Sequence, residues 1–286
     1  MNTLISQPET PSTVAQANKL IEASYHLSLA EKRVLLALLS QVNSHPDAAA
    51  IDGTTALTVT AGGIADMVGL SMDHSYKLLA AAVEKLAERW VVIDNPDPEE
   101  PDTTRTRTRW VTAIDYQPGR GQMRTYLAPK IIPYLTQLSG EFTRYRLQYV
   151  SKMTSVYAIR LYELLVQWQG AGEREVTVDW FKEHFDLGDK YPRIYDLKKF
   201  VLQPAIDQIN EHSNLWVRWG QRKVGRQVVA LQFQFGLKEA KAARAAIDGS
   251  KPKPGKLTRK EIERQARPGE TWDQATARLR QAKTTA

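Results

Sequence analysis

The sequence contains no cysteine. This absence excludes structural disulfides, thiolate catalysis and zinc sites with cysteine ligands, and it fits a reducing compartment. No apolar run approaches the roughly 18 residues that a transmembrane helix needs. Residues 1–16 also lack the basic and apolar regions of a secretory signal. We therefore expect a cytoplasmic protein.

The sequence also lacks the motifs of enzymes that act on nucleotides or DNA. There is no G-x-x-x-x-G-K-[ST] loop to bind phosphates, which excludes a P-loop ATPase. The five histidines are scattered and form no H-x-H pair for the metal of a rolling-circle nickase. Gly119-Arg120-Gly121 indicates a turn and nothing more. We expect no enzyme, no catalytic residue, no metal site and no cofactor.

The 286 residues carry a formal net charge of +7, and this charge is unevenly distributed. Residues 1–102 hold 6 basic and 14 acidic side chains, whereas residues 103–162 hold 10 basic and 2 acidic ones. Residues 163–236 hold 10 of each, and residues 237–286 hold 13 basic and 6 acidic. Clustered basic charge is typical of proteins that bind a polyanion, although a solvated surface gives the same count.

The chain repeats one pattern twice. LLALLSQV (35–42) and LYELLVQW (161–168) share the leucine spacing of an amphipathic helix. Each is followed by residues that predict a short strand, a short helix and a glycine turn, at 57–70 and at 176–188. The two copies therefore begin with the same order of elements.

A longer helix and further strands complete each copy. The second copy ends in alternating apolar residues that indicate a hairpin with Gly220 and Gly225 in its turn. This order predicts an α+β fold with two tandem winged-helix domains related by a pseudo-repeat. Two small α+β domains without a nucleic-acid role remain an alternative. The expected long helices are 75–89 and 194–212, and the expected strands lie at 90–93, 104–116, 215–219 and 220–235.

These elements divide the chain into four parts. Residues 1–17 are rich in Ser, Thr, Pro and Gln, and we expect them to be disordered. We expect the first winged-helix domain at 18–150 and the second at 151–236. Residues 237–286 form a basic linker and tail, which could tether DNA, dock a host protein or be an inert extension.

The second long helix has its basic residues at its N-terminal end. Lys190, Arg193, Lys198 and Lys199 gather there, although cations are unfavourable beside the positive end of a helix dipole. An anionic partner would relieve this conflict, and the N-terminal end of a recognition helix is the part that meets bases and phosphates. Asp196 also relieves it in part, without any partner.

Pro204 lies inside the same helix. Proline removes one backbone hydrogen bond and clashes with the preceding turn, at a cost of about 3 kcal/mol. The helix should therefore kink there, or begin afresh with Pro204 in its first turn. We expect the front half to lie in a DNA groove while the rear half packs on the core.

Further candidate DNA contacts lie on the expected wings. No acidic residue lies between Glu211 and Glu239, and basic hairpin tips in such domains contact the DNA backbone or minor groove. We expect the first domain to contact mainly phosphate and the second to read more of the sequence. The second wing supplies Arg218, Arg222, Lys223 and Arg226, and the first copy supplies His74, Ser75 and Lys77 on its helix and Arg105, Arg107 and Arg109 on its wing.

Three segments resemble the iteron-binding plasmid replication initiators. They are ANKLIEASYHLSLAEKRVLLALLSQV (17–42), SVYAIRLYELL (155–165) and FVLQPAIDQINEHSNLWVRW (200–219), the last followed by LQFQF. The resemblance covers residues 17–236. It implies two winged-helix domains that bind directly repeated origin DNA as a monomer and open the origin.

The resemblance also implies partners and contact residues. Dimers formed through the first domain would bind an inverted repeat and repress the protein's own gene. Hsp70-type chaperones would shift dimer to monomer, and host DnaA, helicase and primase would be recruited. The family often has arginines where Lys198 and Lys199 stand, and lysine does not make the bidentate contact to guanine. The implied contacts are Arg193, Tyr195, Lys198, Lys199, Arg222, Lys223 and Arg226.

A winged-helix transcriptional regulator without an origin role is the other interpretation, because a fold does not fix a function. The DNA near the gene would separate the two. Several direct repeats spaced by about two helical turns indicate an initiator. A lone palindrome indicates a repressor.

Overall fold

The computed structural model describes most of the chain. Met1–Gly236 form one compact unit and Leu237–Ala286 form a second. The expected tail lies outside the described residues except at its first three positions and Arg278. Within the described part, no helix is long and apolar enough to cross a membrane. The described residues are 13–49, 51–68, 72–94, 102–138, 141–239 and 278, with the backbone alone described at 66–68 and 72–75.

The chain enters the fold as a strand. β1 (Thr13–Ala17) pairs antiparallel with β8 (Phe142–Arg146), and α1 (Asn18–Ile21) follows it. Val14 is fully buried. The prediction that residues 1–17 are disordered is therefore wrong for its last five residues. Composition favoured disorder, but the strand that pairs with this segment lies more than 120 residues later in the sequence.

The first domain begins its helical part with a capping box. The Ser28 hydroxyl accepts a hydrogen bond from the Glu31 amide, and the Glu31 carboxylate accepts one from the Ser28 amide. Val34, Leu35 and Leu38 of the following helix are fully buried. These elements, in order, are α2 (Leu29–Leu39), β3 (Ala56–Thr60), α3 (Ala61–Val68) and α4 (Met72–Glu88).

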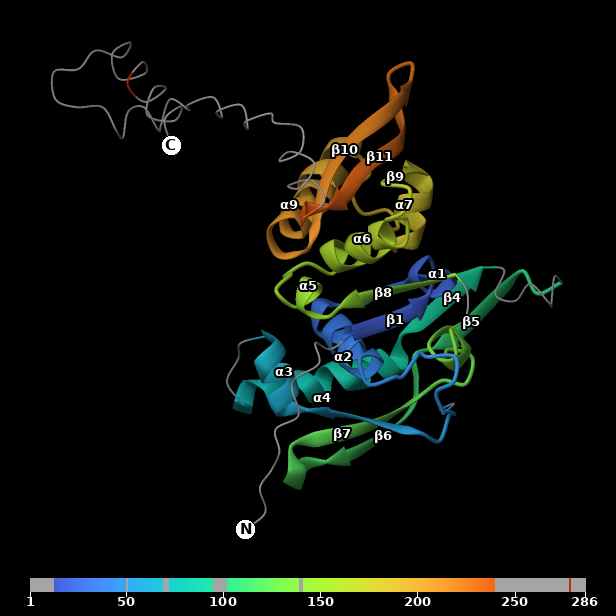
Figure 1. Ribbon diagram of the computed structural model, residues 1–286, viewed down its shortest axis with the longest axis vertical. Coiled ribbons are helices and arrows are strands. Elements are labelled where there is room, and N and C mark those ends of the chain that lie inside the picture. The colour runs from blue at the N-terminus through green and yellow to red at the C-terminus, as the bar shows by residue number, and fades with distance from the viewer. Residues whose placement is uncertain are drawn as a thin grey trace. The chain divides into compact units, whose positions relative to one another are not determined.

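Two three-stranded sheets complete the first domain. Figure 1 shows the strand pairs β4–β5 and β6–β7 that belong to them. One has the order β3-β7-β6 and the other the order β2-β4-β5. Both are antiparallel. Their remaining strands are β2 (Ser24–Tyr25), β4 (Trp90–Asp94), β5 (Arg105–Arg109), β6 (Val111–Gln117) and β7 (Gln122–Leu127), with the single turns η1 (Pro118–Arg120) and η2 (Ile132–Tyr134).

The second domain has the same order with one sheet, β10-β11-β9. The helix expected at 194–212 is present, and we call residues 194–212 the recognition helix. The predicted hairpin is also present, but Gly220 lies inside its first strand and only Gly225 is in the turn. The elements are α5 (Gln148–Ser151), α6 (Val156–Val166), β9 (Glu173–Thr177), α7 (Val178–His184), α8 (Ile194–Leu197), η3 (Lys198–Leu202), α9 (Gln203–His212), β10 (Leu215–Val224) and β11 (Gln227–Leu237).

The recognition helix is interrupted by a π-helical turn. This turn is η3, and the amide of Gln203 donates to the carbonyl of Lys198, five residues earlier. Pro204 then stands in the first turn of α9, where a missing N–H is tolerated. The expected break at Pro204 is therefore present, and a widened turn produces it.

The two sheets of the first domain identify its wing. In the second domain, β9 pairs with β11 and β11 pairs with β10. In the first domain, β3 pairs with β7 and β7 pairs with β6, so β6–β7 is the equivalent hairpin. The prediction that Arg105, Arg107 and Arg109 lie on the first wing is wrong. They lie on β5, in an extra hairpin inserted between α4 and the wing.

Buried polar contacts join the two domains. Lys32 Nζ of α2 lies 2.8 Å from Glu163 Oε2 of α6, and both side chains are almost fully buried. Tyr145 donates its hydroxyl to the other oxygen of Glu163 at 2.5 Å. Arg160 donates to the carbonyls of Tyr25 at 2.9 Å and Ala23 at 2.8 Å.

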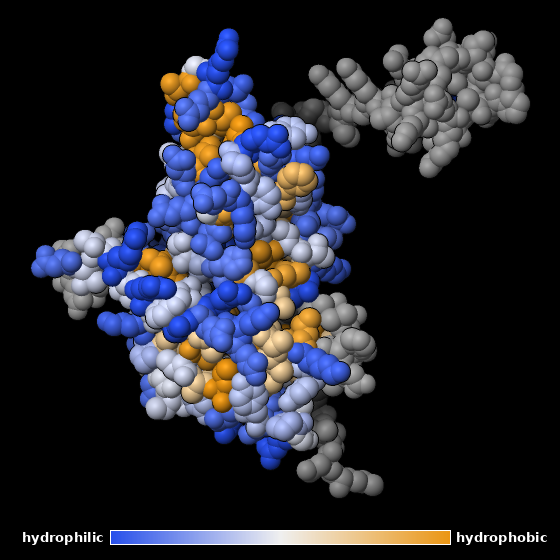
Figure 2. All heavy atoms as spheres, turned by 180° about the vertical axis from the view of Figure 1, so that it is seen from behind, coloured by the Kyte–Doolittle hydropathy of each residue, from blue (hydrophilic) through white to orange (hydrophobic). Residues whose placement is uncertain are grey.

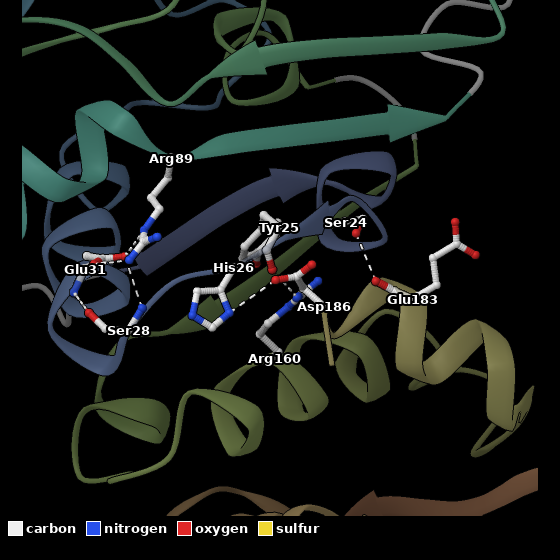
Figure 3. Close-up of polar contacts among 9 residues, drawn as sticks. All are labelled: Ser24, Tyr25, His26, Ser28, Glu31, Arg89, Arg160, Glu183 and Asp186. Carbon is white, nitrogen blue, oxygen red and sulfur yellow. Dashed lines mark hydrogen bonds and ion pairs between the residues drawn. The ribbon is translucent and has the colours of Figure 1, made fainter. Parts of the chain in front are cut away.

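Figure 3 shows the exposed edge of this junction. The Ser24 hydroxyl donates to the Glu183 carbonyl at 2.9 Å, and His26 Nδ1 lies 3.3 Å from Asp186 Oδ2. Arg160 from α6 points into the strand that carries Tyr25. The junction therefore combines one buried ion pair and buried hydrogen bonds with more exposed polar contacts.

Candidate nucleic-acid interface

The recognition helix is tied to the first strand of the second wing. The Asn210 side chain donates to the Val217 carbonyl at 3.0 Å and accepts from the Val217 amide at 2.7 Å. The Trp219 indole donates to Gln203 Oε1 at 2.9 Å. The two bonds to Val217 resemble backbone pairing, and together with the Trp219 bond they hold the helix against the first strand of the wing.

Lys198 takes part in the same connection. Its ammonium donates to the Gln221 side chain on β10 and lies 5.8 Å from the Trp219 ring. The side chain is half-buried and directed toward the wing stem. Of the two adjacent lysines, Lys198 therefore positions the wing, whereas Lys199 is exposed.

Arg193 begins the recognition helix in an ion pair with Asp196. Its Nε lies 2.7 Å and its NH2 3.2 Å from the two carboxylate oxygens. This hydrogen bond raises the pKa of Arg193 above its ordinary value. Asp196 thus holds the exposed guanidinium at the start of the helix, where the first backbone amides add positive potential.

The tip of the second wing carries exposed cations. Lys223 lies near the end of β10 and Arg226 in the turn, and both are exposed, while Gly225 of the turn adopts φ +60°. A side chain at such a backbone angle is strained, so glycine suits the turn. Figure 2 shows a hydrophilic tip above an apolar patch on this hairpin, and Val224 is 63% exposed. The tip of the second wing is therefore cationic, and an apolar patch lies next to it.

Arg222 differs from the tip residues because it has a partner on the sheet. Its Nε lies 2.9 Å and its NH2 2.8 Å from Glu175 Oε1 on β9. The Gln232 amide donates to the other Glu175 oxygen at 2.9 Å. The hydrogen bond from Arg222 lowers the pKa of Glu175 below its ordinary value. Glu175 therefore competes with any phosphate for Arg222.

The first domain presents fewer of its predicted contacts. Lys77 on α4 is exposed. The side chains of His74 and Ser75 lie outside the described residues.

The tip of the β6–β7 wing is η1 followed by Gly121, and Arg120 is exposed there. The sequence pattern of this Gly-Arg-Gly segment predicts only a turn. The matching Gly225-Arg226 turn of the second copy was the signal that could have identified Arg120.

The three arginines of β5 pack on their own hairpin. The guanidinium carbons of Arg107 and Arg109 lie 4.2 and 3.8 Å from the Trp90 ring centre. Arg105 Nε lies 2.7 Å from Asp94. The side chains share one face, as their alternation predicts, and Arg107 and Arg109 both stack on Trp90. Cation–π stacking of this kind fixes arginines in place without neutralising them.

These features define a class of protein. Two winged helices in tandem, each with an exposed cation at its wing tip and a helix held against its sheet, form a double DNA-binding module. Among the residues that the structure describes, no group of His, Asp or Glu side chains could hold a metal ion.

The chain belongs to the initiator replication protein family, whose members are DNA-binding replication initiators rather than enzymes. Residues 13–166 match the family model described as "Initiator Replication protein, WH1". Residues 177–235 match the one described as "Initiator Rep protein, WH2". The predictions of a tandem winged-helix fold and of this family are confirmed.

Two curated proteins and one solved structure are similar to the chain. A "Replication initiation protein" of Escherichia coli is 26% identical over 229 residues, 78% of this chain and 69% of that protein. An "Uncharacterized 27.6 kDa protein" of Escherichia coli is 29% identical over 213 residues, 72% of this chain and 88% of that protein. The crystal structure of the Pi initiator protein in complex with iteron DNA matches with a TM-score of 0.68 and 21% identity, over 81% of this chain and 100% of that one.

Proposed function

We propose that this chain initiates plasmid replication by binding directly repeated origin DNA, or iterons, as a monomer in the cytoplasm. The observation that carries the proposal is the pair of winged helices with exposed cations at both wing tips, Arg120 in one and Lys223 and Arg226 in the other. The Pi initiator, whose fold this chain shares, was solved in complex with iteron DNA, and this supports the proposal.

The two domains have different tasks in this proposal. The recognition helix of the second domain enters a major groove with Arg193, Tyr195 and Lys199 at its front. The wing tip at Lys223 and Arg226 neutralises phosphates. The first domain contributes mainly phosphate contacts, since Lys77 is the one lysine or arginine in the first half of its long helix. Bound monomers then open the origin and recruit host DnaA, helicase and primase.

A dimer has a second task. Two copies joined through the first domain bind an inverted repeat near the gene and repress its transcription. Hsp70-type chaperones shift the dimer to the monomer. A closed two-fold dimer requires a two-fold symmetric DNA site, which a direct repeat does not provide. The oligomeric state therefore selects which DNA is occupied.

A replication assay tests the proposal. A plasmid that carries the direct repeats but no initiator gene is introduced into cells with and without this chain. The proposal predicts that the plasmid is maintained only when the chain is supplied and the repeats are intact. Loss of the plasmid in both cases, with repression of a reporter driven from a palindrome, would instead establish the transcriptional regulator.

A further inference from the structure

An aromatic cluster lies on the exposed front of the recognition helix. Tyr195 is 63% and Phe200 55% exposed. The Lys199 ammonium lies 5.9 Å from the Tyr195 ring and 5.1 Å from the Phe200 ring. The Tyr191 and Phe200 ring centres are 6.3 Å apart, with planes inclined by 29°. These four side chains form one surface around a cation.

The exposure of Phe200 is unusual within this protein. All six phenylalanines lie in the described part of the chain, and the other five are buried or half-buried. A phenylalanine has no polar atom to hydrate, so its exposure favours a partner that covers it. The Phe200 ring lies outside the domain core. The next two residues, Val201 and Leu202, are buried and supply the core contacts at this part of the helix.

Lys199 connects the two exposed rings at the front of the recognition helix. Its ammonium lies near both the Tyr195 ring and the Phe200 ring. Phe200 itself lies within the π turn Lys198–Leu202. Tyr191 also has φ +56°, an uncommon angle for a bulky residue, in the loop that leads into the helix.

We propose that Phe200, supported by Tyr191, reads the 5-methyl group of a thymine in the major groove of duplex DNA. This inference rests on the proposed function and names a determinant of its specificity. An apolar ring contacts a thymine methyl, which no other base presents in the major groove. Lys199 lies where it contacts the adjacent phosphate, so one surface combines an apolar reader with a backbone anchor.

The lysines at positions 198 and 199 leave base discrimination on this part of the helix to another residue. Lys198 is committed to the wing stem, and a lysine does not form the planar bidentate contact that arginine makes to guanine. The front of the helix therefore has little capacity to read guanine edges with these two residues. Phe200 supplies base discrimination by shape and methyl contact, which needs no hydrogen bond.

The test replaces each thymine of the bound repeat in turn by deoxyuridine, which removes only the methyl group. Wild-type protein should lose about fourfold in affinity at one thymine or two adjacent ones, the effect of burying about one methyl group. Phe200→Ala should show no loss at those positions, and Phe200→Leu should restore part of it. Lys223→Ala, the control at the wing tip, should keep the wild-type pattern while binding all duplexes more weakly.

Circular dichroism establishes that each variant is folded. We expect the fold to be retained because the replaced side chains are exposed. Equal effects of deoxyuridine on wild type and Phe200→Ala at every thymine would overturn the inference. So would a Phe200→Ala defect confined to single-stranded DNA. If wild-type protein binds repeats and scrambled DNA equally, the proposed function itself fails. If the protein binds the repeats specifically but deoxyuridine affects wild type and Phe200→Ala equally, only the proposed role of Phe200 is wrong.

Discussion

At the scale of single residues, ion pairs decide which basic side chains can bind DNA. Arg222 is bound by Glu175 and Arg193 by Asp196, whereas Lys223 and Arg226 are exposed at the wing tip. A phosphate must displace a carboxylate to reach the first two. Such an exchange of one anion for another contributes less to affinity than contact with an exposed lysine.

Removing the competing carboxylate should strengthen binding. Glu175→Gln removes the carboxylate that pairs with Arg222. A phosphate can then bind the guanidinium without displacing another anion. We expect tighter binding to DNA of any sequence. The slope of log affinity against log salt should steepen by roughly the amount that one phosphate contact contributes. Fluorescence anisotropy across a salt series measures both.

Glu173→Gln is the matched control, because it removes the same charge from the same strand. Glu173 is exposed on β9 and is not the partner of Arg222. If both variants strengthen binding equally, net charge accounts for the effect. Arg222 would then have no specific role.

The side chains of the site were predictable as a set, but their pairing was not. The alternation of basic residues and their clustering near the recognition helix are visible in the sequence. Asp196 was expected to relieve the charge of the helix start in general, and in the structure it bonds Arg193. Glu175 lies 47 residues before Arg222, on a strand whose register the sequence does not reveal.

At the scale of elements, the wing of the first domain should contact DNA through Arg120. This residue is exposed at the tip of β6–β7, the hairpin equivalent to β10–β11. Arg120→Ala should reduce the slope of log affinity against log salt by about 0.9, the value for one phosphate contact. The slope is measured by titrating duplex DNA at several salt concentrations.

Arg107→Ala serves as the comparison. Arg107 is exposed too, but it lies on the inserted hairpin and stacks on Trp90. Its removal should leave the salt slope unchanged. A reduced slope with Arg107→Ala and an unchanged slope with Arg120→Ala would contradict the assignment of the wing.

The π turn of the recognition helix should matter for sequence-specific binding. Pro204→Ala restores an N–H donor and removes the clash that favours the widened turn. A regular helix would then rotate its front half relative to α9. We expect repeat-specific affinity to fall several-fold while binding to unrelated DNA stays the same, measured by competition with scrambled duplex. Unchanged specific affinity would refute the coupling between Pro204 and the reading surface.

The sequence revealed most elements and misplaced one hairpin. Helix periodicity, the Ser28–Glu31 capping box and the alternation of β11 each predicted the element found. The first wing was misassigned because β4 follows α4 directly, just as β10 follows α9. Only strand pairing shows that β4 and β5 form another sheet with β2, and pairing between distant strands depends on contacts that local patterns do not contain.

At the scale of the whole molecule, the buried pair Lys32–Glu163 should hold the two domains together. Lys32→Met leaves the Glu163 carboxylate buried without its cation. Breaking such a pair costs about 3–5 kcal/mol. We expect the free energy of unfolding, measured by urea denaturation, to fall by an amount of this order.

A double variant separates the charge from the packing. Lys32→Met with Glu163→Leu replaces the pair by apolar side chains and should recover much of the lost stability, since no charge stays buried alone. Asp94→Asn, which removes the exposed partner of Arg105, should leave the free energy of unfolding nearly unchanged. Equal losses from the single and double variants would contradict this account, because removing the unpaired charge would then recover no stability.

The central claim is that two winged helices of one chain read directly repeated DNA. Its most direct test is the affinity of the purified full chain for direct-repeat DNA from its own replicon and for scrambled DNA of equal length, across a salt series. The account predicts a tight complex with the repeats that persists at salt concentrations where scrambled DNA is released. Equal affinity for both DNAs with the same steep salt dependence would contradict it, because only the basic patches would then be binding.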